Sequence, residues 1–164
     1  AFKASLTVDA ALLPKPETDI GRKQVKSTGL ASWTPREDWL LESRLVFRWR
    51  NYEDNRTDLR ADATWSWGVW TVKTRLNGVH DGGFGVLGYL EGGWKPPGGF
   101  GWIRFTAYST PAWQARIYVY ERDAPGNFTA PTYYGTGFSV MAYAGWKKRV
   151  GKTTFKLYLR GSFK

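Results

Sequence analysis

The sequence predicts an all-β protein in which antiparallel strands follow one another up and down and close into a barrel of about ten strands. Three observations lead to this fold class. Apolar and polar residues alternate with a period of two along most of the chain, and helical periodicity is nearly absent. Short Gly-, Pro-, Asn- or Asp-containing stretches separate the alternating segments. Closure is expected because a barrel leaves no strand edge unpaired.

The individual strands follow from the alternation, taken in chain order. In 41–50, for example, Leu45 and Phe47 share one face while Arg44 and Arg48 share the other. Strict alternation predicts strands within 2–10, 41–50, 59–67, 70–76 and 153–163. Less regular patterns predict five more within 22–34, 84–95, 100–109, 113–121 and 136–147.

A tight turn is predicted where three tryptophans crowd around one glycine. Trp65 and Trp67 are odd-numbered members of an apolar face, whereas Trp70 opens an even-numbered one. A straight strand cannot change parity in this way, but a turn at 66–69 can, because Gly68 tolerates a positive φ. The tryptophans then flank a hairpin turn at one end of the sheet.

Composition limits the possible classes of protein. The 164 residues contain no Cys and one His, which excludes disulfides, thiolate metal sites and multi-histidine metal sites, so we expect neither a metal nor a cofactor. There is no linker or composition shift, which predicts one domain over 1–164. The sequence contains no apolar run of about 18 residues, the length that would predict a transmembrane helix. The start carries no signal-peptide pattern, as in a mature chain whose signal sequence has been removed.

A formal charge as high as this chain's +10 usually suggests that the partner is nucleic acid or an anionic membrane surface. Here the basic residues are scattered singly between apolar ones, so we expect no nucleic acid partner. The alternation itself fits two kinds of barrel. In a soluble avidin- or lipocalin-like barrel the apolar face points inward to a ligand, and in a membrane barrel it points to lipid.

Strand length and aromatic placement favour the transmembrane barrel. Segments of about 9–12 residues match a tilted membrane crossing. Aromatic rings gather near strand ends, as expected at the boundary between lipid and water. The expected membrane-interface aromatics are Trp33, Trp39, Trp67, Trp70, Trp94, Trp102, Trp113, Tyr133, Tyr134, Trp146 and Phe163. Lys147, Lys148 and Arg149 beside Trp146 are either contacts to lipid phosphates or a solvated turn.

The stretch 113–137 carries a family resemblance. Its Arg-Ile-Tyr-Val-Tyr-Glu-Arg-Asp run, followed by Pro-Thr-Tyr-Tyr-Gly-Thr-Gly, resembles the C-terminal barrel region of outer-membrane helix-hairpin-helix (competence ComEA-like) proteins of Bacteroidota. Weaker likeness extends over 39–164. The resemblance implies a bacterial outer-membrane location, with the bilayer and its lipids, or other outer-membrane chains, as partners. Nothing here matches the family's helix-hairpin-helix region. The chain therefore corresponds to a C-terminal part, or a cut-down form, of such a barrel, and DNA handling is not carried over.

The polar face of the predicted strands carries charges that would line the lumen. The expected lumen-facing charged residues are Glu42, Arg44, Arg48, Arg50, Arg60, Asp62, Lys73, Arg75, Glu91, Arg104, Arg116, Glu121, Lys156 and Arg160. They form either an anion-attracting pore or a set of ion pairs that fills the lumen. Barrels of about eight strands are filled by side chains, which favours a narrow or closed lumen for about ten.

Three functions compete on this basis. The first is an integral outer-membrane β-barrel that acts as a scaffold or narrow pore with an Arg-rich lumen and no catalysis. The second is the soluble ligand-binding barrel. The third is an outer-membrane hydrolase that uses His80 beside Asp81, although no nucleophile motif accompanies that pair.

Overall fold

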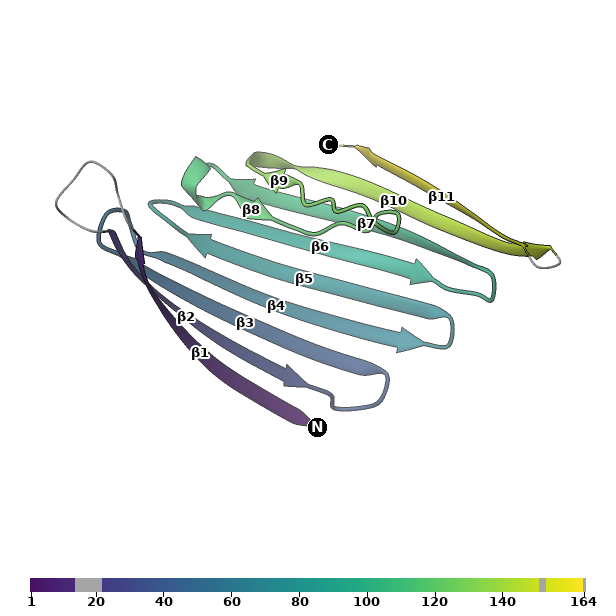
Figure 1. The fold of residues 1–164 in the computed structure, drawn as a ribbon, viewed down its shortest axis with the longest axis horizontal. Coiled ribbons are helices and arrows are strands. Elements are labelled where there is room, and N and C mark those ends of the chain that lie inside the picture. The colour runs from purple at the N-terminus through teal and green to yellow at the C-terminus, as the bar shows by residue number, and fades with distance from the viewer. Residues whose placement is uncertain (14–21, 151–152, 164) are drawn as a thin grey trace.

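Nearly the whole chain forms one antiparallel β-sheet. The structure is a computed structural model that describes residues 1–13, 22–150 and 153–163. The sheet has nine strands in the order β1-β2-β3-β4-β5-β6-β7-β10-β11 (Figure 1). The strands are β1 (Phe2–Leu13), β2 (Arg22–Trp33), β3 (Trp39–Arg50), β4 (Arg56–Trp67), β5 (Trp70–His80), β6 (Phe84–Trp94), β7 (Gly99–Thr110), β10 (Gly135–Val150) and β11 (Thr153–Phe163). The predicted all-β, up-and-down antiparallel architecture is confirmed.

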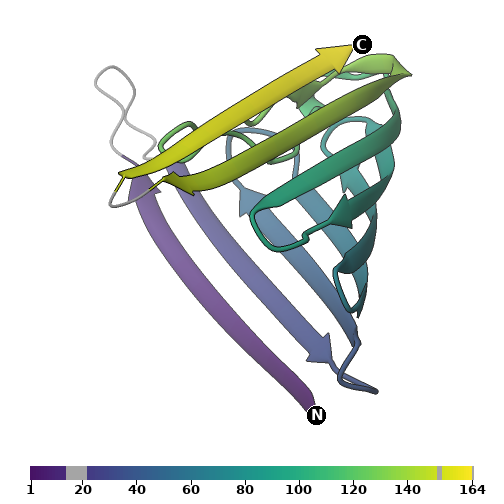
Figure 2. The same cartoon turned by 90° about the vertical axis from the view of Figure 1, so that its right-hand side faces the viewer.

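The sheet curves strongly but does not close (Figure 2). Among the described residues, β1 pairs only with β2 and β11 only with β10, so the expected closure is not observed. The strand count explains the difference from the expectation. The first and ninth strands of an up-and-down sheet run in the same direction, so these two edges cannot join through an antiparallel ladder.

The hairpin turns follow the glycine and proline signals. Trp67 pairs with Trp70 across a two-residue connection in which Gly68 has a φ of 55°, which confirms the predicted turn at 66–69. The β6–β7 connection likewise uses a positive φ, at Gly98. No helix in the described part of the chain is both long and apolar enough to cross a membrane.

The predicted strand at 113–121 is wrong. This part of the chain belongs to a segment, residues 111–134, that leaves the sheet after β7 and returns to it at β10. It contains the 3₁₀ turn η1 (Trp113–Ala115) and the short strands β8 (Ile117–Tyr118) and β9 (Thr132–Tyr133), which pair only with each other. Figure 2 shows this inner segment inside the curve of the sheet. Ile117 and Val119 alternate as in a strand, but their partners are the sheet's inner face.

The largest core of the molecule lies beneath the inner segment. Ala115, Ile117, Val119 and Tyr133 pack against Val79 of β5 and against Leu87 and Tyr89 of β6. Gly85 of β6 permits this approach, because a Cβ there would lie 2.7 Å from the carbonyl oxygen of Ala115. The concave face of β5–β7 is therefore covered by protein.

Candidate functional site

The two faces of the sheet differ sharply in chemistry. On the convex face, large apolar side chains of every strand are exposed, from Leu6 on β1 to Leu157 on β11. At the end of the sheet that holds the β4–β5 turn, this apolar face ends in an exposed tryptophan belt, defined as Trp33, Trp39, Trp65, Trp67, Trp70, Trp94 and Trp146. Trp39 and Trp65 stack with ring centroids 6.2 Å apart, and Trp70 lies 6.2 Å from Trp94. The belt follows the hairpin ends.

The concave face carries the charged residues that the period of two placed together. The register aligns Glu42 with Asp62 and Asp62 with Arg75. Farther along, Lys73 lies opposite Glu91, which lies opposite Arg104. The predicted residues on β3, β4, β5, β6, β7 and β11 thus share one face of the sheet. Arg116 and Glu121 differ from the expectation, because they belong to the inner segment rather than to a strand of the sheet.

Glu91 is the most completely buried of these charges. Its residue is 0% exposed, and its Oε2 accepts hydrogen bonds from Arg104 Nε at 2.9 Å and Nη2 at 2.6 Å. Its Oε1 accepts two more from Arg122 of the inner segment, at 3.1 and 2.9 Å. Arg104 also donates to the carbonyl of Tyr120, at 2.9 Å. Glu91 therefore links sheet and inner segment through hydrogen bonds on both oxygens.

Asp62 on β4 is a second buried carboxylate with a different environment. Arg75 donates to its Oδ1 at 2.6 Å, and Lys73 Nζ lies 3.9 Å from the same oxygen. Arg60 Nε approaches Oδ2 to 2.7 Å, but the contact lacks hydrogen-bond alignment. Three cations thus surround one carboxylate, which leaves an excess of positive charge on the concave face.

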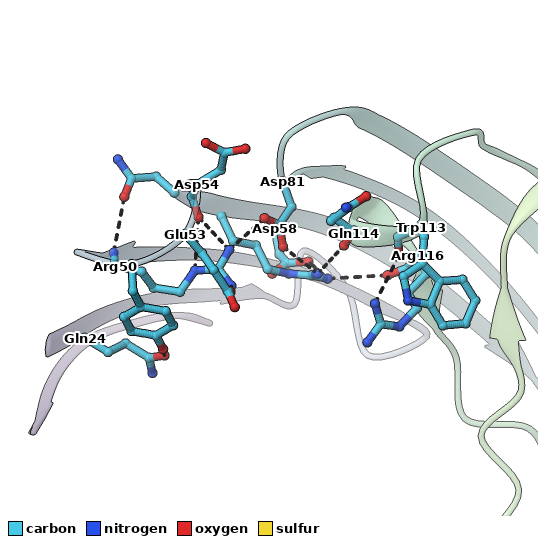
Figure 3. A network of polar contacts seen from close by, with 12 residues as sticks. Gln24, Arg50, Glu53, Asp54, Asp58, Asp81, Trp113, Gln114 and Arg116 are labelled. Atoms are coloured by element: carbon cyan, nitrogen blue, oxygen red, sulfur yellow. Dashed lines mark hydrogen bonds and ion pairs between the residues drawn. The ribbon is translucent and has the colours of Figure 1, made fainter. Parts of the chain in front are cut away.

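Asp81 follows β5 and joins two further arginines (Figure 3). Its two oxygens accept hydrogen bonds from Arg50 at 2.7 Å and Arg56 at 3.2 Å. Arg56 also binds Asp58 and the carbonyl of Gln114 in the inner segment. His80 is exposed and, by its register with Phe84, shares the convex face. The arrangement commits Asp81 to arginines, so it does not orient the His80 imidazole as a hydrolase would require.

The inner segment is fastened to β11 through Glu121 and to β10 through the Tyr133 hydroxyl, which lies 3.2 Å from the Ser139 hydroxyl. Glu121 accepts hydrogen bonds from Arg160 and, at 2.8 Å, from the Tyr133 hydroxyl. Burial raises the pKa of the Tyr133 hydroxyl above its usual range, which keeps it a proton donor. The ion pairs of Glu91 and Glu121 thus hold this segment from two sides.

Four of the expected interface aromatics lie away from the convex face. Trp102 is buried on the concave face, where the Arg122 guanidinium sits 3.4 Å from its ring centroid, and Tyr133 is buried in the main core. Trp113 and Tyr134 are exposed but belong to the inner segment, where their rings meet edge to face. The other expected residues, Phe163 included, are exposed on the convex face.

Sequence reasoning missed several residues that organise the concave face. Arg56, Asp58 and Arg122 join the ion-pair network, and Asp81 joins it in place of any role beside His80. The run Glu121-Arg122-Asp123 could have indicated this network, since charges of alternating sign that become buried need partners of the opposite sign.

Comparison with models of protein families, with curated proteins and with solved structures finds no match to this chain. Within the described ranges, no group of three or more His, Cys, Asp or Glu side chains is placed to hold a metal ion.

Proposed function

We propose that this chain forms the wall of an integral β-barrel in a bacterial outer membrane, acting as a scaffold or narrow pore without catalysis. The direction of curvature carries the proposal. The exposed apolar side chains lie on the convex face, and the ion pairs lie on the concave face with the inner segment. In a membrane barrel the outer surface meets lipid and the lumen is polar.

The soluble alternative requires the opposite curvature. A soluble ligand-binding barrel keeps its apolar face inside and its charges outside. Here the apolar side chains of the convex face, such as Leu6, Leu76 and Leu157, would all remain in water. Such a face exposes far more contiguous apolar area than a soluble monomer usually carries. The curvature therefore favours lipid as the partner of the apolar face.

The tryptophan belt supports the same placement. Indole rings combine a large apolar body with an N–H donor, which suits the boundary between acyl chains and headgroups. The belt lies along one end of the sheet and ends at turns bearing polar residues such as Asp38, whose carboxylate accepts a hydrogen bond from Trp65 Nε1 at 2.9 Å. The resemblance of 113–137 to outer-membrane barrels of Bacteroidota is consistent with this location.

A filled lumen is favoured over an open pore. The inner segment covers the concave face of β5–β7, and Glu91, Asp81 and Glu121 hold cations on both sides of it. Closure of the barrel is part of the proposal. Unpaired backbone groups cost several kcal/mol each in lipid, so the free edges of β1 and β11 must pair with other strands. Because these edges run in the same direction, antiparallel closure needs an odd number of additional strands between them.

Single cysteines offer a direct test, because the chain has none. Leu76→Cys on the convex face and Lys73→Cys on the concave face of the same strand form a matched pair. Leu76 is 68% exposed, whereas the Lys73 side chain is only 24% exposed. After reconstitution into liposomes, we expect a membrane-impermeant maleimide to label the Lys73→Cys variant and to leave the Leu76→Cys variant unlabelled. A lipid-soluble maleimide should label the Leu76→Cys variant.

Detergent dependence provides the control. The folded protein should require detergent and should migrate faster on a gel before boiling than after it. A protein that is monodisperse in plain buffer, and whose Leu76→Cys variant reacts there with the impermeant reagent, would contradict the proposal.

A further inference from the structure

A cavity of about 730 Å³ opens at one end of the concave face, between the ends of β3 and β4 and the inner segment. This cationic cavity is defined by Arg48, Arg50, Tyr52, Glu53, Asp54, Arg56, Asp81, Gln114 and Arg116, which line it. Its volume lies within the range of about 300–1,000 Å³ that is typical of small-molecule sites. Figure 3 shows most of its polar network. It lies on the charged face, away from the surface proposed to meet lipid.

The arginines of the cavity fall into two classes. Arg50 and Arg56 are neutralised, because Asp81 accepts hydrogen bonds from both, Glu53 accepts one from Arg50, and Asp58 accepts two from Arg56. Within the described residues, neither Arg48 nor Arg116 is paired with a carboxylate. The Nε of Arg48 is buried without a hydrogen-bond partner. Among the described residues, the Arg116 guanidinium contacts uncharged groups, namely the Tyr118 hydroxyl at 2.7 Å, the Trp113 carbonyl at 3.1 Å and the rings of these two residues.

The sheet register makes the charge on Arg48 costly. Arg48 lies directly opposite Lys26 on β2 and Arg56 on β4, and of these three cations only Arg56 has carboxylate partners among the described residues. Like charges in direct register repel each other. Of the carboxylates that line the cavity, Glu53 and Asp81 are already paired with Arg50 and Arg56, whereas Asp54 accepts hydrogen bonds from Arg50 through its backbone carbonyl. A negative charge supplied from outside would relieve this repulsion.

We propose that the cationic cavity binds a phosphate-bearing anion, which Arg48 of β3 and Arg116 of the inner segment hold together. A phosphate group carries up to two negative charges near neutral pH and presents several acceptor oxygens. It can therefore accept hydrogen bonds from two guanidinium groups at once and offset the charge of both. This site does not depend on whether the apolar face meets lipid.

The test measures binding to the purified full chain in detergent by isothermal titration calorimetry in phosphate-free buffer. The two probes are inorganic phosphate and detergent micelles doped with phosphatidic acid. We expect saturable binding that weakens about tenfold or more in Arg48→Gln and in Arg116→Gln, as for the loss of one charge-assisted hydrogen-bond partner. Saturation by inorganic phosphate identifies a water-borne ligand. Saturation only by the doped micelles identifies a lipid headgroup.

Arg44→Gln is the matched control. Arg44 lies on the same face of β3 and also has a buried, unpartnered Nε, but it does not line the cavity. Its replacement should change the affinity by less than about twofold, since a distant charge is screened. No saturable binding to either probe, or an equal loss in Arg44→Gln, would overturn the proposal. Arg116→Gln keeps the test decisive if Arg48→Gln does not refold, because Arg116 lies outside the sheet.

Discussion

Glu91 and Asp62 are buried carboxylates on the same concave face, yet their surroundings differ. Glu91 lies under the inner segment, where Arg104 and Arg122 place hydrogen bonds on both of its oxygens. Asp62 has Arg60, Lys73 and Arg75 around it, but its Oδ2 lacks an aligned donor. Among the sheet's own cations, the side chain of Arg104 beside Glu91 is 5% exposed, against 11% for Arg75, 24% for Lys73 and 31% for Arg60 beside Asp62. Arg122, which the inner segment supplies to Glu91, is 35% exposed.

This difference indicates what the inner segment does for the sheet. Where the segment covers the concave face, the sheet's own charges Glu91 and Arg104 are withdrawn from water and need dedicated partners. Where the segment is absent, cations reach solvent and tolerate a loose arrangement. The energetic importance of a concave-face charge should therefore depend on its cover rather than on its number of partners.

Removal of the covered charge should have the largest effect. In Glu91→Gln, the buried Arg104 guanidinium loses the one carboxylate that pairs with it among the described residues, which should lower the free energy of unfolding by about 3–5 kcal/mol. Urea denaturation in detergent micelles, followed by tryptophan fluorescence, measures this. The double variant Glu91→Leu, Arg104→Met removes both charges and should recover at least half of the loss. A loss below about 1 kcal/mol in the single variant would show that cover does not govern these ion pairs.

The matching change at the uncovered site should cost less. In Asp62→Asn, Arg60, Lys73 and Arg75 lose their shared carboxylate but the first two reach water, so we expect a loss of about 1–2 kcal/mol in the same assay. Added salt should reduce the stability difference between Asp62→Asn and the unchanged protein, because screening acts on charges that contact solvent. An Asp62→Asn variant as unstable as Glu91→Gln would remove the distinction between the two sites.

Much of the sheet could be predicted from local pattern alone. Alternation assigns strands such as β3 and β4 because each residue's face depends only on its parity. The same rule places Arg44, Asp62 and Arg75 together. It also shows why one expectation was wrong, since Trp102 is two residues from Arg104 and must share its concave face. Parity places Trp102 on the concave face, although its position near the start of β7 resembles that of an interface aromatic.

Long-range features were beyond such reasoning. The segment around Ile117 and Val119 alternates like a strand, and only contacts with distant residues such as Val79 reveal that it lies inside the sheet. Closure likewise depends on the total strand count, which no local window contains. The ion pair between Glu91 and Arg122 links positions 31 residues apart, with the whole of β7 between them, so its partners could not be assigned.

The smallest expected effect concerns Asp123 of the inner segment, whose carboxylate is solvated, unlike those of Glu91 and Asp62. Hydrogen bonds from the Thr129 hydroxyl and the Ala124 N–H hold the pKa of Asp123 below its usual value of 3.8. A lowered folded-state pKa means that this local stabilisation is fully present above pH of about 4. It is lost as the pH falls through the lowered pKa, so acid should loosen the turn at 123–129.

A carbon-13 NMR titration of the Asp123 carboxyl should therefore give a midpoint below 3.8, and Thr129→Val should shift that midpoint upward. A midpoint unchanged by that substitution would mean that the Thr129 hydroxyl does not hold the carboxylate. The comparison between covered and uncovered charges would then not extend to this exposed turn.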